Sequence, residues 1–102
     1  MQPWPKSITL TSVQFTWDLQ KAKSNRDKHG VSFEEAVTVF ADPLALVMED
    51  ALHGERAILI GQSEKQRLLF TVFVELAEDS IRIISARRAT SHERRRYEEG
   101  DP

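Results

Sequence analysis

Cysteine is absent from this chain of 102 residues, so neither disulfide bonds nor thiolate metal sites contribute to its fold. No stretch approaches the roughly 18 apolar residues of a membrane span. The N-terminus has Pro3, Trp4 and Pro5 where a secretion signal would have basic and then apolar residues. We therefore expect a cytoplasmic protein. With 40% hydrophobic residues, the chain has enough apolar side chains for one compact core but not for two.

Several common functional motifs are missing as well. The sequence has no glycine-rich phosphate loop, no G-x-S-x-G turn and no paired cysteines, which excludes the usual nucleotide-binding, hydrolase and zinc-module classes. The three histidines, His29, His53 and His92, are scattered without the i, i+4 spacing of a metal site. We expect neither a metal nor a cofactor. The classes that are left are binding modules and enzymes with metal-free chemistry.

Positive charge is present but unevenly distributed. The formal net charge is −2, which argues against a protein that coats nucleic acid through bulk positive charge. Between residues 82 and 97, however, a single acidic residue accompanies six arginines, which are Arg82, Arg87, Arg88, Arg94, Arg95 and Arg96. This end of the chain is therefore the candidate for contact with an anionic partner.

Local patterns divide the chain into an irregular lead-in, residues 1–12, and one domain, residues 13–102. Apolar and polar residues alternate over residues 13–17, which predicts a first strand. Asp18 is a favourable helix N-cap and Gly30 a favourable left-handed C-terminal residue, so a first helix is expected between them.

A second helix is expected from the capping-box spacing of Ser32 and Glu35, and it should end before Pro43. Thr90 and Glu93 repeat that spacing and predict a last helix up to Gly100. Between these helices, short apolar runs predict four consecutive antiparallel strands at residues 44–48, 57–60, 68–76 and 81–86. The predicted fold is α+β, a single small domain with the element order β-α-α-β-β-β-β-α and a four- to five-stranded, mainly antiparallel sheet.

Strict alternation in residues 67–76 predicts which side chains share a face of this sheet. Leu68, Phe70, Val72 and Val74 are expected to face the core. A tight turn before Ile81 would pair that residue with Leu76, and would place Glu75 opposite Arg82, Thr71 opposite Ala86 and Leu69 opposite Arg88. One face would then carry Arg67, Glu75, Arg82 and Arg88. Spacing alone favours an ordinary cross-strand ion pair on a solvated face.

Such a cluster has the chemistry to cleave RNA. The 2′-hydroxyl attacks the adjacent phosphate when a base removes its proton, cations stabilise the phosphorane, and an acid protonates the leaving oxygen. Arginine suits the cationic role because its planar fork matches two phosphate oxygens. Glu75 is a candidate base, but neighbouring arginines would weaken its basicity. Glu75 would then only orient Arg82, with Lys28 or His29 transferring protons.

The candidate residues in the helices also have simpler explanations. Lys28 and His29 lie in the last turn of the first helix, where cations interact favourably with the negative helix end. In the last helix, Arg94 and Arg95 are spaced i, i+4 from Glu98 and Glu99, which is typical of a solvated surface. Tyr97 is expected either to bind RNA with these arginines and Arg67, or to anchor the helix to the core.

Several segments together resemble one known family, the BrnT-type toxins. The matching strings are Phe15-x-Trp17-Asp18, Lys28-His29-Gly30-Val31-Ser32-Phe33-Glu34-Glu35-Ala36, Phe40-x-Asp42-Pro43 and Arg82-Ile83-Ile84-Ser85-Ala86-Arg87-Arg88-Ala89. They occur in the family's order and extend from about Val13 to Gly100. Residues 1–12 depart from the pattern. The resemblance implies a RelE-like fold, which agrees with the element order predicted above.

The resemblance also implies a function. It implies metal-independent endoribonuclease activity that cleaves messenger RNA and inhibits translation. Neutralisation would come from a BrnA-like antitoxin with a ribbon-helix-helix segment, in a 2:2 heterotetramer that reaches operator DNA only through the antitoxin. Carried onto this chain, the catalytic candidates are Lys28, His29, Glu75, Arg82, Arg87 and Arg88.

Two alternatives to an active ribonuclease are open at this stage. The chain is either a binding module that docks on an acidic antitoxin or contacts DNA phosphates, or a degenerate toxin that serves as a co-repressor. The ribonuclease hypothesis predicts that replacing Arg87 and Arg88 by alanine abolishes RNA cleavage while the melting temperature hardly changes.

Overall fold

The computed structural model describes residues 6–10, 12–77 and 79–100. From Val13 onward it confirms the predicted order of elements. The elements are β1 (Lys6–Leu10), β2 (Val13–Trp17), α1 (Leu19–His29), α2 (Phe33–Thr38), the short 3-10 helix η1 (Val39–Ala41), β3 (Leu46–Glu49), β4 (Arg56–Gln62), β5 (Leu68–Ala77), β6 (Ser80–Arg88) and α3 (Ser91–Glu99).

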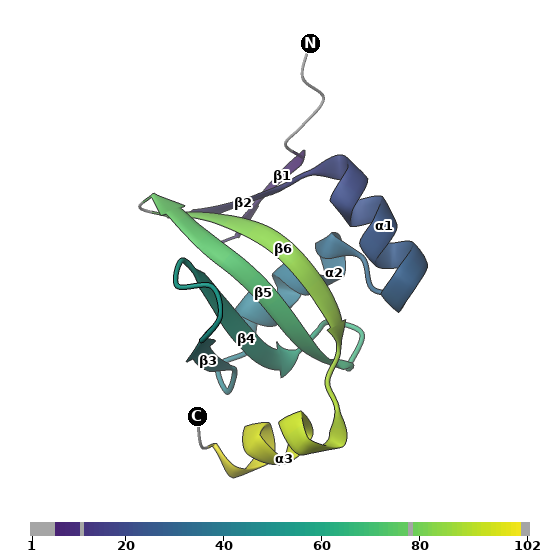
Figure 1. The fold of residues 1–102 in the computed structure, drawn as a ribbon, viewed down its shortest axis with the longest axis vertical. Helices are drawn as coiled ribbons and strands as arrows, with labels where there is room; N and C mark the ends of the chain where they lie inside the picture. Colours follow the sequence, from purple (N-terminus) through teal and green to yellow (C-terminus); the bar gives the residue numbers. More distant parts are fainter. Residues whose placement is uncertain (1–5, 11, 78, 101–102) are drawn as a thin grey trace.

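The strands form one six-stranded sheet in the order β1-β2-β6-β5-β4-β3. All neighbours are antiparallel except β2 and β6, which are parallel, so the sheet is mixed. Helices α1 and α2 contact β6, and α3 contacts β4 at the end of the molecule away from β1 (Figure 1). Within the described residues, no helix has the length and apolar content needed to cross a membrane.

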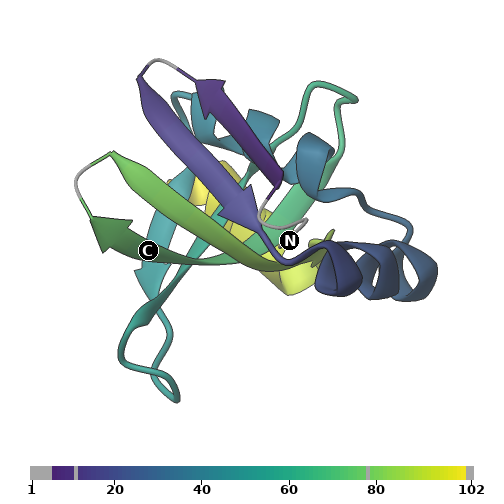
Figure 2. The same cartoon turned by 90° about the horizontal axis from the view of Figure 1, so that it is seen from above.

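The prediction of an irregular lead-in is wrong for residues 6–10, which form β1 and pair with β2 in a hairpin (Figure 2). Residues 1–5 and 11 of the lead-in lie outside the described part. Ser12, at a φ of 70°, turns the chain between the two strands. A five-residue strand gains its hydrogen bonds from the neighbouring strand, which a local pattern does not reveal. The sheet therefore has six strands, where four or five were expected.

The predicted helix boundaries are confirmed for α1 and α3. The Asp18 carboxylate accepts hydrogen bonds from the first turn of α1, and Gly30 ends this helix at a φ of 70°. Thr90 and Glu93 form both bonds of a capping box. Only half of the box predicted at Ser32 is present, because the Glu35 amide donates to Ser32 Oγ while the Glu35 side chain bonds elsewhere.

The core lies on the other face of β5 from the one predicted. Leu69, Thr71 and Phe73 are buried against the helices. Of the four residues predicted to face the core, Leu68 is buried, whereas Phe70, Val72 and Val74 are half-buried on the opposite face. Both faces of β5 carry large apolar side chains, so alternation identified the strand but not its inward face. The core comprises Phe15, Trp17, Val31, Phe33, Ala36, Val37, Val39, Leu59, Leu69, Phe73, Ile83 and Ala86.

A buried side chain attaches α1 to the sheet. Strand β2 pairs with β6 only as far as Arg82, and Asn25 of α1 bonds to β6 further along. The Asn25 amide group donates to the Ala86 carbonyl at 2.8 Å and accepts from the Ala86 N–H at 3.1 Å, as a neighbouring strand would. It also donates to the Val31 carbonyl at 3.0 Å. This contact fixes where the last turn of α1 lies along β6.

Candidate active site

A cleft of about 200 Å³ lies where α1 meets β6. We call it the α1–β6 cleft, and it is lined by Lys21, Ser24, Asn25, Lys28, His29, Ile84 and Ser85. The structure thus brings the Lys-His pair of the first helix next to the Ser85 segment of β6, 56 positions after His29 in the sequence. The cleft combines cationic, imidazole and hydroxyl groups, which are suited to binding and protonating an anion.

Lys28 and His29 owe their position to the end of α1. They are exposed, and Gly30 stops the helix directly after them. In residues 6–10, 12–77 and 79–100, neither side chain makes a hydrogen bond or an ion pair with another residue. The attraction of cations to the helix end explains why they are tolerated there, yet both can also contact a ligand in the cleft.

Arg88 is the last residue of β6 and does not line the α1–β6 cleft. It lies two residues beyond Ala86, the residue held by Asn25, and alternation places both on the α1 side of the sheet. Its register partner is Leu69, as predicted, and Thr71 likewise pairs with Ala86. The Arg88 side chain is exposed and makes no ion pair with any residue that the structure describes.

The expected pairing of Glu75 with Arg82 is contradicted by the register. Glu75 lies opposite Ile81 and Arg82 lies opposite Val74, because the ladder is irregular between Val72 and Phe73 and again between Glu75 and Ala77. Each irregularity shifts the register, which a pattern of strict alternation cannot anticipate. Adjacent positions in a strand point to opposite faces, so Arg82 and Glu75 do not share one.

Distance along the sheet also separates the predicted arginines. Arg82 and Arg88 are six residues apart in β6, which corresponds to about 20 Å of extended strand. A single phosphate group cannot contact both. The predicted gathering of Arg67, Glu75, Arg82 and Arg88 on one face is therefore not found. Arg67 and Arg88 lie toward the end of the sheet where α1 terminates, and Glu75 and Arg82 lie toward the other end.

Arg87 is held on the opposite face of the sheet by α3. Its guanidinium donates to both carboxylate oxygens of Glu93 at 2.9 Å and lies 4.0 Å from the centre of the Phe70 ring. Burial alone would raise the pKa of the Glu93 carboxyl, but the Arg87 hydrogen bonds, the Thr90 amide and the Arg87 charge outweigh it and lower this pKa. Arg87 thus connects β6 to α3.

Tyr97 attaches α3 to Asp42, the residue that ends η1, and RNA binding by Tyr97 stays a prediction. Its hydroxyl donates to Asp42 Oδ2 at 2.6 Å. Burial and this hydrogen bond to a carboxylate raise the Tyr97 pKa to about 12. Arg94 and Arg95 are exposed, and the i, i+4 pairs expected with Glu98 and Glu99 are not among the ion pairs of the described residues.

Arg67, predicted to bind RNA, contacts a buried carboxylate. Glu35 is 1% exposed and accepts hydrogen bonds from Arg67 Nε at 3.0 Å, from a terminal nitrogen of Arg67, and from Ser63 Oγ at 2.6 Å. Burial alone would raise the Glu35 pKa, but the bonds from Arg67 and Ser63 and the nearby positive charges lower it below its usual value. Arg67 also donates to the Gly30 carbonyl at 3.2 Å.

Sequence patterns missed two of these residues. Glu35 was assigned to a helix cap, and nothing in its spacing connects it with Arg67, 32 residues later. Asn25 is a polar residue in a mostly solvated helix, and no pattern there distinguishes it from its exposed neighbours. Among the described residues, no three His, Cys, Asp or Glu side chains form a group that could hold a metal ion.

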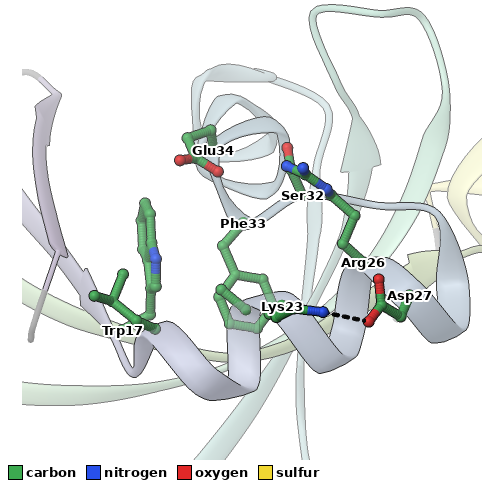
Figure 3. A pocket seen from close by; sticks show the side chains of 9 residues that line it. Trp17, Lys23, Arg26, Asp27, Ser32, Phe33 and Glu34 are labelled. Atoms are coloured by element: carbon green, nitrogen blue, oxygen red, sulfur yellow. Dashed lines mark hydrogen bonds and ion pairs between the residues drawn. The ribbon is translucent and has the colours of Figure 1, made fainter.

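A second cleft, of about 260 Å³, lies between α1 and the start of α2 (Figure 3). Trp17 and Phe33 form its apolar floor, with their rings edge to face at 5.9 Å, and both are at most 1% exposed. Lys23 and Asp27 form an ion pair at its rim, drawn as a dashed line. None of the residues predicted for catalysis or RNA binding lines this cleft.

These features define a small α+β protein with a cationic cleft beside a helix end, as suits a phosphodiester ligand. The chain belongs to the family described as ribonuclease toxin, BrnT, of type II toxin-antitoxin system, which matches residues 17–93. Its fold is similar to the crystal structure of the Brucella abortus ribonuclease toxin BrnT, with a TM-score of 0.61 and 23% sequence identity over 74% of this chain and 94% of that one. Comparison with curated protein sequences gave no match.

Proposed function

We propose that this chain is an endoribonuclease that cleaves messenger RNA in the cytoplasm without a metal ion and thereby inhibits translation. Membership of the ribonuclease toxin family supports the reaction class. The observation that carries the proposal is the placement of Lys28 and His29 in one cleft with Ser85 of β6. In this position an imidazole and an ammonium group both reach the same small volume.

The proposed reaction uses the RNA's own 2′-hydroxyl as the nucleophile. One group removes the proton of the attacking 2′-hydroxyl and another supplies a proton to the leaving 5′-oxygen. His29 takes one of these roles, since imidazole can perform both, and a water molecule takes the other. Lys28 and Arg88 stabilise the negative charge that develops on the phosphorane. The products are a 2′,3′-cyclic phosphate and a 5′-hydroxyl end.

Other predicted residues have roles further from the bond that breaks. Arg87 positions α3 through Glu93, and α3 presents Arg94 and Arg95 to the RNA backbone. Glu75 and Arg82 lie toward the other end of the β5–β6 hairpin. In this proposal they contact the RNA strand beyond the cleaved phosphate.

An antitoxin partner follows from the type II family. We propose that it is a BrnA-like ribbon-helix-helix protein that covers the α1–β6 cleft in a 2:2 complex and mediates all contact with operator DNA. Covering the cleft would exclude RNA and pair the cleft's positive charges with acidic groups in one step. Added RNA should therefore slow association of the antitoxin.

The proposed activity is tested by incubating the purified chain with a defined RNA in EDTA and mapping the new ends. We expect cleavage with 2′,3′-cyclic phosphate ends, a loss of about 100-fold or more in His29→Ala, and a loss in Lys28→Ala. Lys23→Ala is the matched control, since Lys23 is an exposed lysine of the same helix outside the α1–β6 cleft. Intact RNA with retained binding to an antitoxin would support the binding-module alternative instead.

A further inference from the structure

Helix α2 is attached to the loop between β4 and β5 by a set of polar contacts that the reaction proposed above does not use. The Glu35 carboxylate accepts hydrogen bonds from the Ser63 hydroxyl and from the Arg67 guanidinium. Thr38 Oγ accepts from the Glu64 N–H at 2.9 Å and donates to the Glu35 carbonyl at 2.6 Å. The Ser63 N–H in turn donates to the Arg67 carbonyl at 2.9 Å, which closes the loop. These contacts hold the loop in one conformation and thereby fix the position of Arg67.

The same guanidinium reaches a third element. While Nε and one terminal nitrogen bond to Glu35, that terminal nitrogen also donates to the Gly30 carbonyl at 3.2 Å. Gly30 follows His29 directly and ends α1. Arg67 therefore connects the end of α1 to the buried Glu35 carboxylate, and Glu35 fixes the orientation of the Arg67 guanidinium toward the Gly30 carbonyl.

We infer that Glu35 is a positioning residue for the cleavage reaction, acting through Arg67 and Gly30 on Lys28 and His29. This inference rests on the proposed function of the α1–β6 cleft. Asn25 fixes the last turn of α1 along β6, and the Glu35–Arg67 pair fixes its end. Together they hold the imidazole and the ammonium group relative to Ser85. Displacement of a catalytic group by about 1 Å is enough to lower a rate about 100-fold.

The alternative is that Glu35 and Arg67 only stabilise the fold, and a double replacement separates the two roles. Removing one partner leaves a buried charge unpaired, so Glu35→Gln or Arg67→Met alone is expected to lower stability as well as activity. Replacing both, as in Glu35→Leu with Arg67→Met, removes the charges together and is often neutral for stability. The double variant still lacks the bond to the Gly30 carbonyl.

The experiment compares wild type, the two single variants and the double variant by thermal melting, by steady-state cleavage of a defined RNA, and by amide hydrogen exchange. For the double variant we expect a melting temperature near that of wild type, a kcat lower by about tenfold or more, and a KM changed less than about twofold. Amide exchange in the last turn of α1 should accelerate about tenfold, while β5 stays protected. Asp27→Ala removes the exposed Lys23–Asp27 pair of the same helix and is the control expected to keep kcat.

A wild-type kcat in the double variant would overturn the inference, as would unchanged exchange at the end of α1. Arg67→Lys offers a second test, because a lysine that reaches both Glu35 and the Gly30 carbonyl should restore part of kcat relative to Arg67→Met. If wild type itself cleaves no RNA, the proposed function fails. The exchange measurement then still decides whether Glu35 and Arg67 hold the end of α1.

Discussion

Thr71 places a hydroxyl group in the core of the protein without a hydrogen-bond partner. The residue is fully buried, and its Oγ bonds to no other described residue. A buried hydroxyl in that state loses its hydration without compensation. We therefore expect Thr71→Val to raise the free energy of unfolding by about 1 kcal/mol, seen as a higher urea midpoint with an unchanged slope.

Thr38→Val is the control for that prediction and should have the opposite sign. The Thr38 hydroxyl both donates to the Glu35 carbonyl and accepts from the Glu64 amide, so its removal breaks two bonds. A loss of stability in Thr71→Val comparable to that in Thr38→Val would mean that the Thr71 hydroxyl has a favourable interaction in solution.

Arg87 and Arg88 are neighbours in sequence whose replacements should differ in effect. Arg87→Ala leaves the part-buried Glu93 carboxylate without its guanidinium and removes the contact with Phe70, so we expect a loss of about 1 kcal/mol or more. Arg88→Ala removes an exposed side chain and should lower RNA cleavage with little change in stability. This changes the expectation from sequence, under which both replacements leave the melting temperature nearly unchanged. Thermal melting and cleavage assays on the single variants test it, and equal melting temperatures would contradict it.

Tyr97, the only tyrosine of the chain, attaches α3 to Asp42, and its titration reports on this attachment. The Tyr97 pKa is raised from its ordinary value of 10 to about 12 in the folded protein. The hydrogen bond to Asp42 therefore contributes stability in full below pH 10, and this contribution is lost as the pH rises toward about 12. We expect the tyrosinate absorbance of the native protein to appear near the raised value, and that of the denatured chain near 10.

Tyr97→Phe tests the same attachment by removing the hydroxyl. It should lower stability at neutral pH by about 1 kcal/mol and abolish part of the loss of stability at alkaline pH. It should also accelerate amide exchange in α3 relative to α1. A native tyrosine that titrates at its ordinary value would show that α3 is not held at Asp42 in solution.

The sequence predicted elements better than it predicted the contacts between them. Caps at Asp18 and Gly30 are local, and a few neighbouring residues determine them, so the bounds of α1 were found. The inward face of β5 was not found, because Thr71 faces the core while Phe70 is on the outer face. Irregularities in the β5–β6 ladder shifted Glu75 and Arg82 apart for a reason that no local pattern records.

In the candidate site, too, local patterns predicted individual residues but not the contacts between distant ones. Lys28 and His29 were identified through a string of neighbouring residues, and the structure places them in a cleft with Ser85. The contacts that hold them, from Asn25 to Ala86 and from Glu35 to Arg67, join residues that are 61 and 32 positions apart. Pairings of that kind depend on the fold of the whole chain.

Across the molecule, three carboxylates with lowered pKa values connect the helices to other elements. Glu35 joins α2 to the β4–β5 loop, Asp42 joins η1 to α3, and Glu93 joins α3 to β6. Each lies opposite a donor that favours its ionised form, namely Arg67, Tyr97 and Arg87. Protonation of these groups weakens several attachments at once, so acid should loosen the helices from the sheet before the strands separate.

The stability of the whole protein should therefore depend on acid through Glu35 and Glu93. Both have a folded pKa below the ordinary value of 4.5, so their contribution is present in full well above that pH and is lost as the pH falls through the lowered values. Glu35→Gln combined with Glu93→Gln should reduce stability at neutral pH and flatten its decline below about pH 5, measured by urea unfolding across this range. Glu98→Gln, at an exposed position of α3, is the control that should keep the wild-type slope. If the double variant kept that slope too, neither Arg67 nor Arg87 would hold its carboxylate in solution.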